Sequence, residues 1–205
     1  MATGRAADKA TDKAALRHEI RRSRAAEPPD VRVRRAQLLM SHGAALATRA
    51  GSAVAGFQPT NHEPDISALL MVLALPVYLP RALSASELEW VRARPDDLRG
   101  GHRGIPRPKG PAVALGPGIA SLGVGVMLVP ALAVDPSTGA RLGYGAGFYD
   151  RLLADLSPAV FTVAVCREQD QRVLPVEAHD VPVAAVLTEA GLVSVGSAGD
   201  APAED

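Results

Sequence analysis

A glycine-rich segment with charged residues on both sides is the part of this sequence best suited to chemistry. Glycines stand at positions 143, 145 and 147, between Arg141 and Asp150. The apolar run 126–129 before them is typical of a buried strand, and leucines after them recur at helical spacing. The first amide groups of a helix attract anions, and glycine lets a phosphate approach the backbone closely. The segment indicates a phosphate-binding loop, although a flexible turn would also explain three glycines in a chain with 19 of them.

The spacing within this segment excludes two common nucleotide-binding motifs and resembles a third signature. Phe148 stands where a dinucleotide fingerprint requires glycine, and the lysine of a P-loop is missing. The string RLGYGAGFYDR, residues 141–151, follows LVPALAVD and closely resembles the signature of the 5-formyltetrahydrofolate cyclo-ligase family, also called methenyltetrahydrofolate synthetases. Two positions depart from the commoner family pattern, since Ala146 is often glycine or lysine there and Phe148 is often tyrosine.

Basic residues near the N-terminus extend the resemblance. Residues 8–25 predict an amphipathic, alanine-rich helix. Lys13 and Arg17 lie one turn apart, so both can reach one anion, and KAALR resembles the Lys-x-x-Leu-Arg pattern with which the family contacts ATP phosphates and substrate. A solvated basic face is the alternative explanation, and we assign Arg21 and Arg24 to it as surface charges.

Acidic residues supply the other candidate ligands. The resemblance makes Glu63 a folate ligand, because two carboxylate oxygens can accept hydrogen bonds from adjacent N–H groups of a pterin, and it puts Gln58 at a neighbouring substrate-lining position. It makes Asp150 and Asp180 magnesium ligands, which phosphate oxygens and water would complete to an octahedral shell. Without the resemblance, helix capping and turn formation explain all three acids. In the expected substrate-covering segment, Arg107 stands where the family has an acid or an amide.

The composition indicates a single globular domain. The chain has 205 residues, 47% of them hydrophobic, and a formal net charge of zero, which gives no support for a nucleic-acid partner or an acidic membrane surface. The longest apolar run, 68–75, is too short to span a bilayer, and the N-terminus lacks the apolar core of a signal peptide, so we expect a cytoplasmic protein. We expect disordered tails at 1–7 and 197–205 and one domain over 8–196.

The pattern of hydrophobic residues predicts an α/β fold. Continuous rather than alternating apolar runs are typical of strands covered on both faces, and here they alternate with helical segments. Strands are expected at residues 52–57, 75–79, 126–129, 161–166 and 184–188, and helices at 8–25, 31–50 and 66–73 and after the glycines. Residues 81–117 are predicted to be irregular. The resemblance implies a three-layer α/β/α sandwich with a mainly parallel sheet, similar to the sugar-phosphate isomerase and CoA transferase fold.

The resemblance implies a small-molecule enzyme that needs ATP and Mg²⁺. It converts 5-formyltetrahydrofolate to 5,10-methenyltetrahydrofolate with release of ADP and phosphate, after phosphorylation of the formyl oxygen. The residues implied for ATP are Lys13, Arg17, Arg141, Leu142, Gly143, Tyr144, Gly145, Ala146, Gly147, Phe148 and Tyr149. Those implied for folate are Gln58, Glu63, Tyr144, Gly145, Ala146, Gly147 and Phe148. Lys13, Arg17 and Arg151 are expected to be catalytic, and Asp150 and Asp180 to bind metal.

Two other functions are compatible with the sequence. A non-catalytic protein that binds folate or nucleotide could keep the same fold, and so could an enzyme similar to a sugar-phosphate isomerase. The residues show neither a nucleophile and base pair nor a shared histidine spacing for a metal. We expect the chain to be a monomer or a weak dimer.

Overall fold

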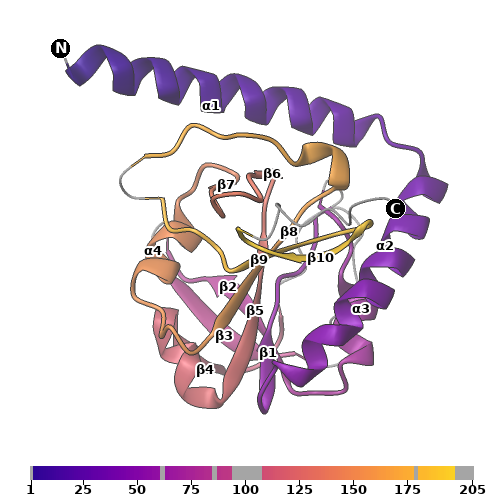
Figure 1. The fold of residues 1–205 in the computed structure, drawn as a ribbon. Helices are drawn as coiled ribbons and strands as arrows, with labels where there is room; N and C mark the ends of the chain where they lie inside the picture. Colours follow the sequence, from indigo (N-terminus) through magenta and orange to yellow (C-terminus); the bar gives the residue numbers. More distant parts are fainter. Residues whose placement is uncertain (1, 61–62, 85–86, 94–107, 178–179, 197–205) are drawn as a thin grey trace.

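The computed structural model describes residues 2–60, 63–84, 87–93, 108–177 and 180–196 (Figure 1). Arg107 lies outside the described residues. The helices are α1 (Ala2–Ala25), α2 (Pro29–Gly43), α3 (Ser67–Val72) and α4 (Phe148–Ala154), with shorter 3-10 helices η1 (Ala44–Thr48), η3 (Gly116–Leu122) and η4 (Glu168–Asp170). The strands are β1 (Ala53–Ala55), β2 (Val77–Ala82), β3 (Leu88–Arg92), β4 (Ala112–Leu115), β5 (Val124–Pro130), β6 (Ala133–Val134), β7 (Arg141–Leu142), β8 (Phe161–Val165), β9 (Ala185–Thr188) and β10 (Gly191–Ser194).

Eight of the strands found in the described residues form one sheet in the order β10-β9-β8-β5-β1-β2-β3-β4. The central neighbours from β9 to β2 pair in parallel, whereas β10, β3 and β4 pair antiparallel at the two sides. Strands β5 and β9 are buried along almost their whole length, as continuous apolar runs in a parallel sheet should be. The remaining strands, β6 and β7, form a separate antiparallel hairpin.

Helices cover both faces of the sheet. On one face Leu39 of α2 and Leu69 of α3 pack in the same cluster as Val126 of β5. On the other face Leu152 of α4 packs in the cluster that contains Met127, the next residue of that strand. Successive strand residues point to opposite faces, so β5 contributes to both clusters. The expected α/β/α sandwich with a mainly parallel sheet is confirmed.

Helix α2 begins and ends at residues with a clear physical role. Pro29 stands in its first turn, where a missing amide proton costs nothing, and Asp30 places a negative charge beside it. The helix ends at Gly43, seven residues before the expected end. A Cβ on Gly43 would lie 2.5 Å from the Leu69 side chain, so glycine lets α2 approach α3 closely.

The chain leaves the sheet in opposite directions after β1 and β5. Helix α3 follows β1 on one face and leads to β2, and α4 follows β5 on the other face and leads to β8. Adjacent parallel strands with diverging connections leave a crevice at their carboxyl ends, where open α/β sheets bind ligands. The glycine-rich loop follows β5 and Glu63 follows β1. Both therefore belong to this edge of the sheet.

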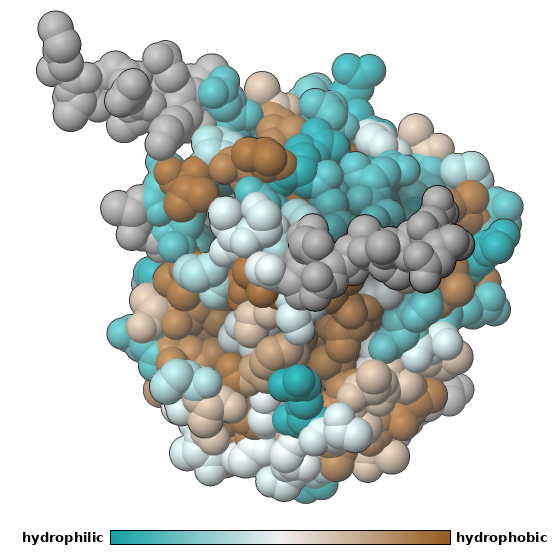
Figure 2. All heavy atoms as spheres, in the orientation of Figure 1, coloured by the Kyte–Doolittle hydropathy of each residue, from teal (hydrophilic) through white to brown (hydrophobic). Residues whose placement is uncertain are grey.

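Helix α1 lies over this edge, above β6 and β7 (Figure 1). It begins at Ala2 rather than at residue 8, and the tail expected at 197–205 lies outside the described residues. Its apolar contact is small and centres on Ile20, which packs with Leu132 and Leu142. Figure 2 shows a hydrophilic area where the end of α1 meets the start of α2. Among the described residues, no helix combines the length and the apolar content needed to cross a bilayer.

The prediction that residues 81–117 are irregular is wrong for part of the segment. Strands β3 and β4 extend the sheet there, and Trp90 of β3 is fully buried, with its indole Nε1 donating a hydrogen bond to the Gly116 carbonyl oxygen at 2.9 Å. Strand β10 was also not expected. All three are antiparallel strands at the sides of the sheet. Such strands can expose one face or one edge to solvent, so the hydrophobic pattern in their sequence is weaker.

Replacing Gly125 by alanine is expected to destabilise the fold. A Cβ at this position in β5 would lie 2.5 Å from the backbone carbonyl oxygen of Arg49, which cannot move aside like a flexible side chain. Overpacking of this kind costs about 1–3 kcal/mol. Urea unfolding followed by circular dichroism should show a lower midpoint for Gly125→Ala. Gly118→Ala is the matched control, since nothing lies within 4 Å of its Cβ. Equal midpoints for the two variants would contradict this packing.

Candidate active site

The glycine-rich loop joins the β6–β7 hairpin to helix α4. Gly145 has φ 108° and Gly147 has φ 67°, a region that favours glycine, whereas Gly143 does not have a positive φ. Gly147 is the N-cap of α4, which begins at Phe148 and is only seven residues long. The glycines at 145 and 147 therefore shape the turn, and the short helix contributes little dipole. Any strong attraction for an anion has to come from side chains.

Basic side chains of α1 and α4 surround this loop. Arg17 of α1 donates from Nε to the Gly143 carbonyl oxygen at 2.9 Å, which fixes the helix to the loop. Arg151 of α4 donates from Nη2 to the Ala146 carbonyl oxygen at 3.0 Å and lies over the Phe148 ring at 5.5 Å. Lys13 lies one turn before Arg17 and is buried. The expected cluster of cations beside the loop is present.

Carboxylates within the site pair with Lys13 and Arg141. Lys13 Nζ contacts Asp180 Oδ2 at 2.8 Å and Glu177 Oε2 at 2.6 Å. Burial alone would lower the pKa of Lys13, but these two acids raise it above the ordinary value. Arg141 Nη2 contacts Asp150 Oδ1 at 2.6 Å, and burial lowers the pKa of Arg141 although Asp150 and Asp180 both oppose the shift. The charges of Asp150 and Asp180, the two carboxylates that the resemblance assigns to magnesium, therefore both act on the Arg141 guanidinium.

The two aspartates fit a magnesium ion that takes most of its ligands from phosphates and water. Carboxylate oxygens are hard ligands of the kind Mg²⁺ prefers, and Mg²⁺ in nucleotide sites needs only one or two of them. Within the described residues, no group of three or more His, Cys, Asp or Glu side chains could hold a metal ion by itself. The arrangement therefore fits a metal that arrives with a nucleotide and does not fit a metal held by the protein alone.

Glu63 is a half-buried acid on the Tyr144 side of the loop. Its Oε2 accepts a hydrogen bond from the Thr60 amide at 2.6 Å. Burial raises its pKa, while the Thr60 hydrogen bonds, the charge of Arg24 and a hydrogen bond from Tyr144 act in the opposite direction. The Tyr149 hydroxyl is also near this carboxylate, and it is buried with no hydrogen-bond partner among the described residues. A polar ligand that reaches Glu63 would find this hydroxyl beside it.

The assignment of Arg24 as a surface charge is wrong. Arg24 is 2% exposed and forms an ion pair with Asp170, Nη2 to Oδ2, at 3.0 Å. Arg21 is exposed, as expected, but its Nη2 donates to the Tyr144 carbonyl oxygen at 2.8 Å and its guanidinium lies 5.8 Å from the centre of the Tyr144 ring. Helical periodicity places these arginines on one stripe with Lys13, but it cannot show which of them finds a partner far along the chain.

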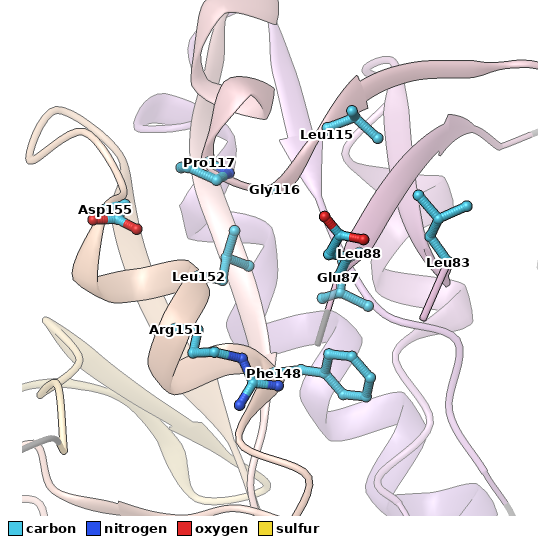
Figure 3. Close-up of a pocket in the computed structure, with 10 residues that line it drawn as sticks. All are labelled: Leu83, Glu87, Leu88, Leu115, Gly116, Pro117, Phe148, Arg151, Leu152 and Asp155. Atoms are coloured by element: carbon cyan, nitrogen blue, oxygen red, sulfur yellow. The ribbon is translucent and has the colours of Figure 1, made fainter. Parts of the chain in front are cut away.

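A cavity of about 280 Å³ lies beside α4 (Figure 3). Its walls come from β3, the end of β4, the start of η3 and helix α4. The lining residues are Leu83, Glu87, Leu88, Leu115, Gly116, Pro117, Phe148, Arg151, Leu152 and Asp155. Figure 3 shows the Phe148 ring and the Arg151 guanidinium next to each other at one end of it. Part of the segment that was expected to be irregular, namely Leu83, Glu87, Leu88 and residues 115–117, thus builds one wall of a cavity next to the loop.

The structure separates the expected site residues into several groups. Lys13, Arg17, Arg141, Asp150 and Asp180 lie around the glycine loop, and Glu63 lies on the Tyr144 side of it. Gln58, which follows β1, is half-buried. Leu142 is 1% exposed in the cluster with Ile20, so its side chain packs inside the protein and only its backbone can reach a ligand.

Glu177 was not among the site residues predicted from the sequence. Its amide donates to Asp180 Oδ2 at 2.8 Å while its carboxylate holds Lys13, so it supports both members of that pair. The spacing of two acids three residues apart in VEAHD, typical of a turn closed by a side chain, could have indicated it.

Comparison with known proteins shows the family of this chain. Residues 9–189 match the 5-formyltetrahydrofolate cyclo-ligase family. A 5-formyltetrahydrofolate cyclo-ligase from Mycolicibacterium smegmatis is 36% identical over 196 residues, which cover 89% of this chain and 97% of the relative. The NMR structure of Aquifex aeolicus 5,10-methenyltetrahydrofolate synthetase has a TM-score of 0.71 and 26% identity, and the match covers 94% of this chain and 96% of that one.

A methenyltetrahydrofolate synthetase from Mycoplasma pneumoniae shares the fold, with a TM-score of 0.68 and 18% identity over 86% of this chain and 98% of that one. The family match spans both the helix that carries Lys13 and the turn that carries Asp180. This chain therefore belongs to the 5-formyltetrahydrofolate cyclo-ligase family and is a ligase.

Proposed function

We propose that the protein catalyses the ATP- and Mg²⁺-dependent cyclisation of 5-formyltetrahydrofolate to 5,10-methenyltetrahydrofolate, with release of ADP and phosphate. One observation carries the proposal. A single short segment, residues 141–150, contacts the basic residues of α1 on one side and the half-buried Glu63 on the other. A nucleotide and a folate that both used this segment would meet at the loop. ATP as co-substrate implies a reaction in the cytoplasm.

The basic residues at the loop suit a triphosphate. Lys13, Arg17 and Arg141 are held by hydrogen bonds and ion pairs before any ligand binds, so little reorganisation is needed. The open space above Gly143, where a Cβ would meet nothing within 4 Å, leaves room for phosphate oxygens near the backbone. In the proposed complex, phosphates replace the carboxylates as partners of Lys13 and Arg141. Arg151 adds positive charge on the α4 side.

Asp150 and Asp180 would hold the magnesium ion, which supplies neutralisation of charge on the transferring phosphate. Exchange of partners explains why both acids are paired with cations in this structure. When phosphates take Lys13 and Arg141, the two carboxylates are released toward the metal. The protein thus keeps its charges balanced both without and with the nucleotide.

The folate is proposed to bind on the other side of the loop. The Glu63 carboxylate accepts hydrogen bonds from the pterin, with the unpartnered Tyr149 hydroxyl beside it. Gln58 is proposed to contribute to the same side, and the Phe148 ring lines the cavity of Figure 3. Phenylalanine at this position keeps the ring surface for packing and lacks the hydroxyl that many family members have.

The proposed reaction has two steps. The formyl oxygen attacks the γ-phosphorus of ATP, the bond to the ADP oxygen breaks, and the formyl carbon becomes electrophilic. N10 then attacks that carbon, the carbon–oxygen bond breaks with departure of phosphate, and the N10 proton is lost to solvent. The phosphorylation step is needed because an amide-like oxygen is a poor leaving group. Positioning and charge neutralisation supply most of the catalysis in phosphoryl transfer.

Loss of either proposed metal ligand is expected to abolish turnover without unfolding the protein. Asp150→Asn and Asp180→Asn should each lower kcat by about a hundredfold or more, because the isosteric amide keeps the shape but not the charge. The measurement is the near-ultraviolet absorbance rise of methenyltetrahydrofolate in the presence of 5-formyltetrahydrofolate and MgATP, with reactions lacking ATP or Mg²⁺ as blanks. Asp30→Asn, in the exposed first turn of α2, is the matched control and should keep full activity.

Circular dichroism must show a native spectrum for both variants. If the single variants Asp150→Asn and Asp180→Asn both kept wild-type activity, the assignment of these aspartates as metal ligands would be refuted. Wild-type protein that produces no absorbance rise with all three reactants would refute the proposed function itself.

The acid limb of the pH profile is expected to report Glu63. The Glu63 side chain must be ionised for both of its oxygens to accept hydrogen bonds from the pterin, so kcat/KM should fall as the pH falls through its pKa. Burial raises that pKa, with Arg24, Tyr144 and Thr60 opposing and Tyr149 close by, so the fall should begin at a higher pH than for an ordinary glutamate. Glu63→Gln should lower kcat/KM and remove this limb. An unchanged limb in the glutamine variant, with the fold intact over the same pH range, would exclude Glu63 as its source.

A further inference from the structure

Arg24 makes a set of contacts that a surface charge or a simple anchor would not need. Its Nη1 donates to the Tyr144 hydroxyl oxygen at 3.0 Å. Its Nη2 donates to the carbonyl oxygens of Ala131 and Leu132 at 2.9 and 2.8 Å, and to Asp170 Oδ2 at 3.0 Å. The guanidinium therefore connects α1, the chain after β5, the turn after β8 and the glycine loop.

The chemistry of the Arg24 and Tyr144 contact fixes the direction of a proton. A guanidinium can only donate, so the Tyr144 oxygen is the acceptor and its own O–H proton has to point elsewhere. Burial raises the pKa of Tyr144, so the hydroxyl stays protonated and remains a donor. The acceptor beside it is the Glu63 carboxylate, which is hydrogen-bonded to Tyr144. The three side chains form a directed sequence, from Arg24 to Tyr144 to Glu63.

Arg24 itself is held rigidly. Its partner Asp170 is 2% exposed and is also bound by Arg167, from Nε to Oδ2 at 2.8 Å and from Nη2 to Oδ1 at 2.9 Å. Two arginines thus share one buried carboxylate, and the backbone carbonyl oxygens bound by Arg24 complete the clamp. A buried ion pair with this many hydrogen bonds holds its side chains in a single conformation. The position of the Tyr144 hydroxyl follows from it.

We propose that Arg24 is a positioning residue for the folate side of the site, which acts through the Tyr144 hydroxyl to orient the Glu63 carboxylate. This inference rests on the proposed function, because it concerns the same site. Arg24 does not contact the substrate. It fixes the hydroxyl that occupies one lone pair of Glu63 and leaves the other carboxylate positions directed at the pterin. The nucleotide side, which depends on Lys13 and Arg17, is not part of this sequence of contacts.

Arg35 provides a matched control for a purely structural role. It is 7% exposed, forms ion pairs with Glu27 and Glu189, and lies in the same charged region between α1 and the end of the sheet. No hydrogen bond or ion pair of Arg35 involves Tyr144 or Glu63 in the described residues. Arg24→Met and Arg35→Met therefore remove the same group from similar surroundings, and they differ in the contact with Tyr144.

The test is isothermal calorimetry with 5-formyltetrahydrofolate and, separately, with MgATP. Arg24→Met and Tyr144→Phe are each expected to weaken folate binding by about tenfold, the size of one hydrogen bond to a charged group, and to change the Kd of MgATP by less than about twofold. The double variant should be no weaker than the weaker single variant, since both changes break the same sequence of contacts. Arg35→Met should lower the unfolding temperature and leave both dissociation constants unchanged.

Three outcomes would overturn the inference. Equal weakening of folate and MgATP binding by Arg24→Met would mean that Arg24 only anchors α1. Full folate affinity in Tyr144→Phe, which removes one oxygen and keeps the ring, would exclude the hydroxyl as the link even if Arg24→Met fails to fold. Additive effects in the double variant would separate the two residues. If the wild-type protein bound both ligands but showed no turnover, the proposed reaction would be refuted. The inference about Arg24 would still be tested by the dissociation constants of the variants.

Discussion

The placement of the C-terminal end of helix α1 depends on one buried ion pair. The helix carries Lys13 and Arg17, yet its apolar contact with the rest of the protein is small and centres on Ile20. Arg24 and Asp170, both almost fully buried, bind the helix to the turn after β8. Burying two charges costs about as much as their attraction returns, so such a pair contributes little net stability. It does exclude other positions of this end of the helix, because a shift there would leave a charge buried without its partner.

Parallel strand topology explains why such distant segments meet. Strands β1, β5 and β8 are neighbours, and their carboxyl ends lead to Glu63, to the glycine loop and to Asp170. The connections after β1 and β5 leave on opposite faces, which opens the edge between them. Helix α1 closes this edge from above and supplies cations to it (Figure 1). The glycine loop is the central element, because Gly143 binds Arg17 of α1, Tyr144 lies beside Glu63, and the loop leads directly into α4, which carries Asp150.

The sequence was most informative where local signals dominate. Continuous apolar runs identified β5, β8 and β9, and the loop signature identified the edge at which the site is built. Antiparallel strands β3 and β4 were missed, because their segment is rich in proline and glycine and their pairing partners lie elsewhere in the chain. Arg24 was assigned to the surface, since its partner Asp170 is 146 residues away and no local pattern points to it. Long-range polar pairs are the part of a fold that spacing cannot reveal.

The balance of charge within the site explains how a chain of zero net charge can suit two anionic ligands. Lys13 is held by Glu177 and Asp180, and Arg141 is held by Asp150. The site is therefore not strongly basic, and its buried cations have carboxylates that compensate for their lost hydration. A triphosphate with its metal brings both signs of charge and can replace each partner by one of the same sign. Pairs that exchange partners keep the geometry of the cations fixed in both states. In the proposed complex, binding would therefore need little reorganisation, and it would favour a ligand that carries phosphate and metal together.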